Sequence, residues 1–237
     1  MSKVLVIIPT YNEIENISAI IQAVMDYEMY HLLIVDDGSP DGTGDRVKDL
    51  QIQYKERLHL VERQGKYGLG TAYIRGFEYG LSQGYDILME MDADFSHNPK
   101  HLPELISALE EKGVGMAVGS RYTKGGGFRN WGWYRLFLSY GASLYTRMIT
   151  GMPVKDPTAG FVAYKREVLE KMDLSKIQFV GYAFQIEMKY YCHRLGYAIK
   201  EIPIIFVDRE LGTSKMNMSI VQEGILGVLK MRMRSYV

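Results

Sequence analysis

The first half of the chain alternates short apolar runs with longer amphipathic stretches. Residues 4–8 and 32–35 are continuously apolar and rich in β-branched side chains, which is typical of strands covered on both faces. Between the runs, apolar residues return at helical spacing, as at Ile14 and Ile17. This alternation over residues 1–120 predicts an α/β fold with a mainly parallel, doubly wound sheet.

Turn-forming and helix-starting residues bound the expected strands. Pro9 ends the first apolar run, and the spacing of Asn12 and Glu15 predicts that the next helix begins with a capping box. Asn98 and Pro99 predict an N-cap and a first helical turn after the central strand. Further strands are expected at residues 58–61, in the first half of 85–97, at 114–118 and at 199–207.

The second half of the chain has a different pattern. Residues 129–150 are aromatic-rich and amphipathic, and residues 216–236 are amphipathic and become basic near their end. No linker rich in Pro, Gly or Ser separates the two halves. We therefore expect one domain over residues 1–237, with amphipathic helices in its C-terminal part.

Charge and cysteine content narrow the function classes. The chain carries 28 Lys and Arg against 28 Asp and Glu, so no net positive field would attract nucleic acid. Cys192 is the single cysteine, which rules out an internal disulfide and suggests a core position. No signal peptide is visible, and no apolar run approaches the ~18 residues of a membrane span. We expect a soluble catalytic domain that binds charged ligands through locally placed groups.

Acidic residues follow three of the predicted strands. Asp92 and Asp94 come after the central strand, Asp36 and Asp37 after the second, and Glu13 after the first. The carboxyl ends of parallel strands share one sheet edge, so these acids should converge on one cleft. If the strand extended to Asp94, both central carboxylates would project from one face and suit Mg²⁺ or Mn²⁺. Asp36 has a second interpretation, in which it only builds the turn after its strand.

Four basic residues come after the predicted first-half sheet: Arg121 just past the fifth strand, Arg135 in the aromatic helix, and then Arg209 and Lys215. Arg121 and Arg209 each come after an apolar strand, so both should face the same sheet edge. Arginine suits bidentate phosphate contact, and lysine acts as a point charge. Together, beside an acidic edge that binds metal, they would imply a second phosphate-bearing ligand, although for each alone a solvated surface role is the better interpretation.

A glycine-rich stretch and the histidines carry weaker signals. Residues 65–70 should form a tight turn that brings the next helix close to the sheet, with Lys66 near the ligand. The stretch lacks the lysine–hydroxyl pair of a P-loop and the spacing of a dinucleotide fingerprint. The 5 histidines show no zinc-like grouping, so none is assigned a catalytic role.

Sequence blocks that cover nearly the whole chain in order resemble the family-2 glycosyltransferases of the GT-A fold. More narrowly, they are similar to the dolichol-phosphate (polyprenol-phosphate) mannose synthases. The blocks are VIIPTYNE (6–13), VDDGSPDGT (35–43), GKYGLGTAY (65–73), MDADFSH (91–97), GSRY (119–122), DPTAGF (156–161), YAFQIE (182–187) and GTSK (212–215).

The resemblance implies a GT-A (Rossmann-like) fold with a nucleotide-sugar-binding half at 1–122 and an acceptor-binding half with interfacial helices at 123–237. It implies a divalent metal, Mg²⁺ or Mn²⁺, on Asp92 and Asp94, while Ser96 stands where some archaeal relatives carry Gln and leaves a third protein ligand open. The implied donor site comprises Pro9, Tyr11, Glu13, Val35, Asp37, Asp92, Ala93 and Asp94. The implied contacts of the acceptor phosphate are Arg121, Arg135, Arg209 and Lys215, and the implied catalytic residues are Asp94, Arg121, Arg209 and Lys215.

The resemblance also implies an activity and its partners. The enzyme would move mannose from GDP-mannose to a polyprenyl (dolichyl) monophosphate with inversion, giving polyprenyl phosphate β-mannose and GDP. It would be cytoplasmic and peripheral on the cytosolic face of a membrane, with a small membrane-anchoring subunit as a partner in some relatives. Residues 129–150 and 216–236 would lie at the membrane surface, unless both simply cover the sheet.

Two other functions stay open at this point. The first is a polyprenyl-phosphate glucosyl or N-acetylhexosamine transferase that uses a UDP-sugar, since carboxylates at a base-binding edge do not select guanine over uracil. The second is a non-catalytic protein that binds nucleotide sugars on the same fold.

Overall fold

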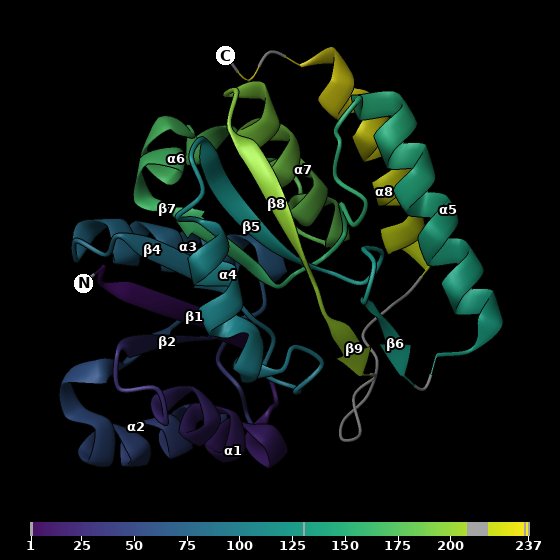
Figure 1. Ribbon diagram of the computed structural model, residues 1–237. Helices are drawn as coiled ribbons and strands as arrows, with labels where there is room; N and C mark the ends of the chain where they lie inside the picture. Colours follow the sequence, from purple (N-terminus) through teal and green to yellow (C-terminus); the bar gives the residue numbers. More distant parts are fainter. Residues whose placement is uncertain (1, 130, 208–217, 235, 237) are drawn as a thin grey trace.

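A computed structural model describes residues 2–129, 131–207, 218–234 and 236 (Figure 1). Its centre is a 7-stranded sheet in the order β3-β2-β1-β4-β7-β5-β8. β7 runs antiparallel to its neighbours β4 and β5, and the other pairs are parallel. The strands are β1 (Val4–Thr10), β2 (Tyr30–Asp36), β3 (Leu58–Glu62), β4 (Ile87–Glu90), β5 (Val114–Ser120), β7 (Val162–Lys165) and β8 (Ala198–Pro203). A separate pair, β6 (Gly127–Arg129) and β9 (Ile205–Val207), is parallel.

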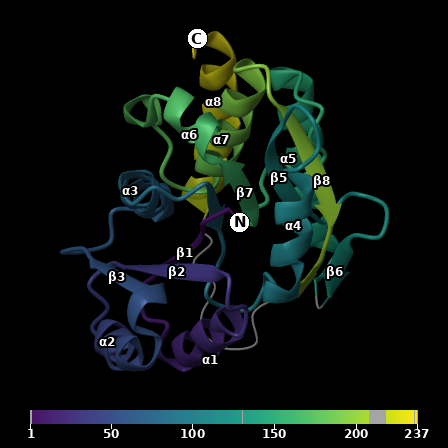
Figure 2. The ribbon, with the colours of Figure 1, turned by 60° about the vertical axis from the view of Figure 1, so that its left-hand side comes forward.

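Helices cover both faces of the sheet (Figure 2). Along β1, Leu5 and Ile7 pack into one core with α3, α6, α7 and α8, while Val4 and Val6 pack into a second core with α1, α2 and α4. This two-sided burial explains the continuous apolar runs in the sequence. The helices are α1 (Ile14–Met25), α2 (Thr43–Tyr54), α3 (Leu69–Ser82), α4 (Leu102–Ala108), α5 (Trp133–Thr150), α6 (Arg166–Lys171), α7 (Tyr182–Arg194) and α8 (Met218–Met233).

The predicted mainly parallel, doubly wound sheet is confirmed, and three local predictions are wrong. β1 continues through Pro9 to Thr10, because Pro9 pairs in register with Val35. Asn12 makes no capping box: α1 begins after Glu13 without a side-chain cap. Residues 199–207 do not form one strand, since Ile204 separates β8 from β9 and each belongs to a different sheet.

The predicted start of the helix after the central strand is confirmed in part. The Asn98 side chain accepts a hydrogen bond from the Lys100 N–H, and Pro99 opens a short 3₁₀ turn (Pro99–His101) that leads into α4. Cys192 is buried in α7, as its sequence context predicts.

The two amphipathic helices of the second half pack against each other at one end of the molecule (Figure 1). Large apolar residues of α5 do not cover the sheet: Trp133, Phe137 and Met148 are 80%, 71% and 75% exposed. Among the described residues of α8, Leu226 and Met233 are also exposed. None of the helices in the described ranges is both long and apolar enough to cross a membrane.

Close packing of α3 on the sheet gives a test of the fold. A Cβ on Gly76 would lie 2.5 Å from Ile7 Cγ2, so Gly76→Ala should lower the free energy of unfolding by about 1–3 kcal/mol. A Cβ on Gly141 of α5 would point into open space, so Gly141→Ala should be neutral or stabilising by about 0.5–1 kcal/mol. Urea unfolding followed by circular dichroism measures both, and equal effects would contradict this packing.

Candidate active site

The carboxyl ends of β1, β2 and β4 lie together at one edge of the sheet. The parallel register pairs Thr10 with Asp36, and β4 runs alongside β1 in the same direction. The Asp37 N–H donates to the Thr10 carbonyl at 3.0 Å, which ties the loops after β1 and β2 together. The acids predicted to converge therefore follow neighbouring strand ends, where open α/β sheets bind their ligands.

Asp92 and Asp94 lie in an irregular turn, because β4 already ends at Glu90. The strand does not extend to Asp94, so the two carboxylates do not project from one face of a strand as alternate residues would. Instead the turn is held by local bonds: Asp94 Oδ1 accepts from the Ser96 N–H at 3.1 Å, and Asp92 Oδ1 accepts from the Tyr73 hydroxyl at 3.4 Å. Phe95 takes a left-handed conformation at φ 60°, which is strained for a bulky residue and is often seen at functional loops.

The acid turn fits a hard divalent cation. Its side chains offer carboxylate oxygens, and the Asp92 side chain is 38% exposed. The Ser96 hydroxyl in the same turn is buried and has no hydrogen-bond partner among the described residues. Within those residues no group of three or more His, Cys, Asp or Glu side chains is placed to hold a metal ion. Hard divalent cations in proteins also take oxygen ligands from substrate phosphates and from water.

At the neighbouring strand end, Asp36 and Asp37 have different partners. Asp36 accepts from the hydroxyls of Thr10 and Ser39, which supports the interpretation that it builds the turn. Asp37 accepts from Arg63 Nε at 2.6 Å. Burial is the largest influence on Asp37 and raises its pKa, and the Arg63 contact only partly opposes this shift. Asp37 is thus held in one orientation at this strand end.

Other predicted donor residues lie along the same edge. Glu13 precedes α1, Val35 is buried in β2, and Ala93 lies between the two central acids. Lys66 Nζ lies 5.1 Å from the centre of the Tyr11 ring, which brings the glycine-rich turn to the end of β1.

The glycine-rich turn packs on the second half of the chain rather than on the sheet. The Gly70 N–H donates to the Val180 carbonyl at 2.9 Å, and a Cβ on Gly70 would lie 2.6 Å from Phe184 Cδ2. The prediction that this turn brings α3 to the sheet is therefore wrong, because Gly76 and Gly80, farther along α3, make the close approach to β1 and β4.

Arg121 follows β5 and is held by a buried carboxylate. Its Nε and NH2 atoms donate to the two oxygens of Asp156 at 2.7 and 2.6 Å, and NH2 also donates to Thr158 Oγ1 at 2.8 Å. Burial alone would raise the pKa of Asp156, but the Arg121 charge and hydrogen bonds outweigh it and hold that pKa below its usual value. The rings of Trp131 and Phe206 lie 5.7 and 5.5 Å from the guanidinium carbon.

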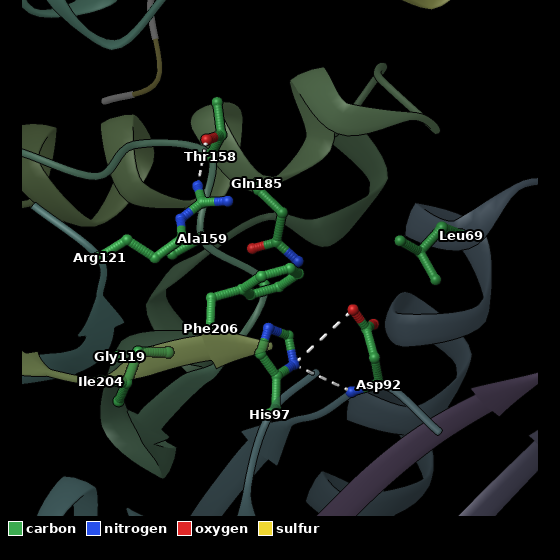
Figure 3. Close-up of a pocket in the computed structure, with 11 residues that line it drawn as sticks. Leu69, Asp92, His97, Gly119, Arg121, Thr158, Ala159, Gln185, Ile204 and Phe206 are labelled. Atoms are coloured by element: carbon green, nitrogen blue, oxygen red, sulfur yellow. Dashed lines mark hydrogen bonds and ion pairs between the residues drawn. The ribbon is translucent and has the colours of Figure 1, made fainter. Parts of the chain in front are cut away.

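A cavity joins the acid turn to Arg121 (Figure 3). Asp92 and Arg121 both line it, so the structure brings a predicted metal ligand and a predicted phosphate ligand to one space. The other lining residues are Leu69, His97, Gly119, Thr158, Ala159, Gly160, Gln185, Ile204 and Phe206.

Three polar residues of this cavity, Thr158, His97 and Gln185, were not among the residues predicted from the sequence. His97 received no role because no other histidine is grouped with it in the sequence. In the structure its Nδ1 accepts from the Asp92 N–H at 3.2 Å, and burial lowers its pKa and favours the neutral ring. Gln185 comes from α7, more than 90 residues beyond Asp92, so only its place in the YAFQIE block could have singled it out.

Of the other three predicted phosphate contacts, only Arg135 lies within the described residues. Arg135 on α5 stacks on Trp131, with its guanidinium carbon 4.1 Å from the ring centre, and it does not line the cavity. Arg209 and Lys215 lie outside the described residues. Their assignment to an acceptor phosphate, like that of Arg135, stays a prediction.

Comparison with known proteins identifies the family. The profile described as "Glycosyl transferase family 2" matches residues 5–173. The chain is 47% identical over 233 residues to a polyprenol monophosphomannose synthase of Mycolicibacterium smegmatis, covering 98% of this chain and 88% of that protein. It is 44% identical over 229 residues to an undecaprenyl-phosphate mannosyltransferase of Micrococcus luteus, covering 96% and 93%.

The chain belongs to glycosyltransferase family 2.

Solved structures confirm the predicted GT-A fold of this glycosyltransferase. Glucosyl-3-phosphoglycerate synthase from Mycobacterium tuberculosis, solved with Mn²⁺ and UDP, matches with a TM-score of 0.69 at 20% identity, covering 98% of this chain and 80% of that one. A mannosyltransferase from Pyrobaculum calidifontis, solved with GDP-Man and Mn²⁺, matches with a TM-score of 0.61 at 20% identity, covering 90% and 58%. At this identity the likeness shows the fold alone.

The ion pair of this glycosyltransferase gives a test of the site. Asp156→Asn would leave the Arg121 charge without its buried partner, so the free energy of unfolding should fall by about 3–5 kcal/mol at pH 7. Because Arg121 holds the folded-state pKa of Asp156 below its unfolded value, the pair stabilises the fold above that unfolded value and loses this effect as the pH falls. The difference between variant and wild type should therefore shrink below about pH 4.

Urea unfolding at several pH values measures this difference. Asp45→Asn is the control, because Asp45 pairs with Lys48 on the surface of α2 and should contribute less than about 1 kcal/mol. A pH-independent loss in Asp156→Asn, or a loss no larger than that of the control, would contradict the assignment.

Proposed function

We propose that this glycosyltransferase moves mannose from GDP-mannose to a polyprenyl monophosphate, inverting the anomeric carbon and releasing GDP. The observation that carries the proposal is the single cavity that connects the acid turn at Asp92 to the guanidinium of Arg121. One end suits the metal-bound diphosphate of a sugar donor, and the other suits the phosphate of an acceptor.

Relatives support the choice of acceptor and sugar. Two proteins at 44–47% identity over nearly the whole chain are named for mannose transfer to polyprenol or undecaprenyl phosphate. The donor is supported by a more distant mannosyltransferase solved with GDP-Man. In this chain, Asp37 and the pair of Lys66 and Tyr11 border the edge where the nucleotide would lie.

The reaction needs no strong base on the protein. A phosphate monoester is already anionic near neutral pH, so one of its oxygens can attack the anomeric carbon directly. The new bond forms on the face opposite the diphosphate, the bond from carbon to the diphosphate oxygen breaks, and its electron pair leaves with GDP. Arg121, fixed by Asp156, would hold the attacking phosphate in line, and such positioning can lower the barrier by several kcal/mol.

Asp92 and Asp94 would hold a divalent cation, Mg²⁺ or Mn²⁺, at the donor end. When bound, the cation supplies positive charge that stabilises the departing diphosphate. Arg209 and Lys215 are proposed as further contacts of the phosphate groups, in keeping with their place in the sequence blocks.

A lipid acceptor requires contact with a bilayer, and the joined helices α5 and α8 offer the surface for it. We place the exposed side chains Trp133, Phe137 and Met148 of α5, with Leu226 and Met233 of α8, in the membrane interface. The protein would then work as a peripheral enzyme on the cytosolic face of a membrane, with or without a small membrane-anchoring subunit.

A transfer assay tests the function and separates its alternatives. Purified protein is given GDP-mannose or UDP-glucose together with polyprenyl phosphate and Mn²⁺, and both nucleotide release and product lipid are measured. Mannosyl lipid and GDP in equal amounts support the proposal. UDP release with glucosyl lipid would support the UDP-sugar alternative, and nucleotide binding without product lipid would support a non-catalytic protein.

The role of the acid turn predicts the effect of a near-isosteric change. Asp94→Asn keeps the shape of the side chain but removes a metal-binding charge, so transfer should fall by about 100-fold or more at saturating Mn²⁺. Asp49→Asn on the exposed surface of α2 is the matched control and should transfer at the wild-type rate. Near-normal transfer by Asp94→Asn, or full wild-type activity in EDTA, would contradict a metal at this turn.

Membrane contact predicts a second change that leaves the cavity untouched. Trp133→Glu combined with Phe137→Glu should weaken binding to anionic vesicles by about 10-fold or more, since each aromatic side chain gains roughly 1.5–3 kcal/mol on burial. Ile52→Glu is the control, because Ile52 is 76% exposed on α2, away from α5 and α8. Vesicle flotation measures the binding, and wild-type protein that does not float, with or without polyprenyl phosphate, would contradict the placement.

A further inference from the structure

The middle of the cavity is lined by a neutral amide whose orientation is fixed by hydrogen bonds to two buried side chains, Glu90 and Lys189. Gln185 is 2% exposed, and its Nε2 donates to the Glu90 carboxylate while its Oε1 accepts from Lys189 Nζ at 3.2 Å. Glu90 and Lys189 are both fully buried. Turning the amide over would set its oxygen against the carboxylate and its NH₂ against the ammonium, so one orientation is strongly favoured.

The network around Gln185 is anchored by Tyr164 on β7 and by the Ala159 carbonyl in the loop before β7. The Tyr164 hydroxyl donates to Glu90 Oε1 at 2.7 Å, and Lys189 Nζ donates to the Ala159 carbonyl at 2.7 Å. Ala159 itself lines the cavity. The amide is therefore a rigid part of the cavity wall, with one further N–H and one further lone pair for other partners.

His97 adds a second neutral polar group to the same wall. Its Nδ1 accepts from the Asp92 N–H at 3.2 Å, so in the neutral ring the proton lies on Nε2. Stacking on Phe161, with ring centres 5.1 Å apart, fixes the plane of the imidazole. Figure 3 shows the second ring nitrogen on the side away from Asp92, toward Phe206 and Gln185.

A glycine keeps the space between these two side chains open. A Cβ on Gly160 would lie 3.5 Å from His97 Cε1 and 3.8 Å from Gln185 Nε2. These are ordinary contact distances, so the fold could accept a methyl group there, but that group would occupy the gap between the imidazole and the amide.

The polarity of the cavity changes along its length. Its ends carry the charges of Asp92 and Arg121, while its middle presents the neutral groups of His97 and Gln185. An uncharged ligand with several hydroxyl groups matches this middle section, because hydroxyls both donate and accept hydrogen bonds. Between a donor diphosphate and an acceptor phosphate, that ligand is the transferred sugar.

We propose that His97 and Gln185 bind hydroxyl groups of the transferred hexose, in a subsite that Gly160 keeps open and that Glu90 and Lys189 hold in shape. This inference rests on the proposed sugar transfer. It assigns the sugar to the cavity wall formed by α7 and the acid turn, and the nucleotide to the strand ends of β1 and β2.

Nucleotide binding with and without the sugar tests the subsite. We would titrate wild type, Gly160→Ala and Gln185→Leu with GDP and with GDP-mannose in Mn²⁺ by calorimetry. Gly160→Ala should bind GDP within about twofold of wild type and GDP-mannose about 10-fold more weakly, a loss on the scale of one buried hydrogen bond. Gly141→Ala, the same change in open space, should leave both affinities as in wild type.

Gln185→Leu removes a hydrogen-bond partner of both Glu90 and Lys189, so this variant could fail to fold. Gly160→Ala then still tests the subsite. A selective loss of GDP-mannose affinity in Gly160→Ala supports the subsite. Equal changes for GDP and GDP-mannose, or no change for either, in a protein whose wild type transfers mannose would overturn the subsite alone. Absence of transfer by the wild type in the assay above would overturn the proposed function, and the subsite with it.

Discussion

The buried pair of Arg121 and Asp156 is the interaction on which the candidate site depends. It joins the end of β5 to the loop before β7 through two side-chain hydrogen bonds and a third from the Arg121 N–H to Asp156 Oδ2 at 3.0 Å. Glu201 on β8 accepts from the Asp156 N–H at 3.0 Å, so a third strand supports the same loop. These contacts fix the Arg121 guanidinium at one end of the cavity, and the acid turn after β4 lies at the other end.

Both halves of the chain contribute residues to the cavity that Arg121 lines. The turn after β4 in the first half supplies Asp92 to the cavity, while the loop before β7 and helix α7 in the second half supply Thr158 and Gln185. The two halves are not independent, because β7 lies between β4 and β5 in the same sheet. Solved neighbours at about 20% identity share the fold, and they are named as a glucosyl-3-phosphoglycerate synthase and a mannosyltransferase. A shared fold does not by itself fix the substrate.

Periodicity and strand-end logic predicted the parts of the molecule that depend on local sequence. The buried strands, the helices between them and the grouping of Asp37 and Asp92 at one edge follow from apolar runs and parallel order. Arg121 could be placed because it directly follows an apolar strand. Of the two interpretations of Asp36, its hydrogen bonds support the one in which it builds the turn after its strand.

The groups that sequence reasoning did not reach depend on long-range packing. Gln185 and Glu90 meet across 95 positions, and Arg121 and Asp156 across 35, and neither pair has a local pattern that points to the other. The role of His97 depends on the Asp92 N–H, which donates to its Nδ1 and so fixes its tautomer. The residue types along the chain do not reveal this contact. The split of residues 199–207 into β8 and β9 escaped for the same reason, since pairing with β5 or β6 decides it.

In the proposed reaction, the acid turn binds the donor diphosphate through a metal, and Arg121 binds the acceptor phosphate in the same cavity. The most direct test is a crystal structure of the protein with Mn²⁺ and GDP-mannose, with the metal located by its anomalous scattering. We expect the metal peak within coordination distance of the Asp92 or Asp94 carboxylates, and the mannose in the cavity with its anomeric carbon toward Arg121. A metal peak away from this turn, or a sugar outside the cavity, would contradict the claim.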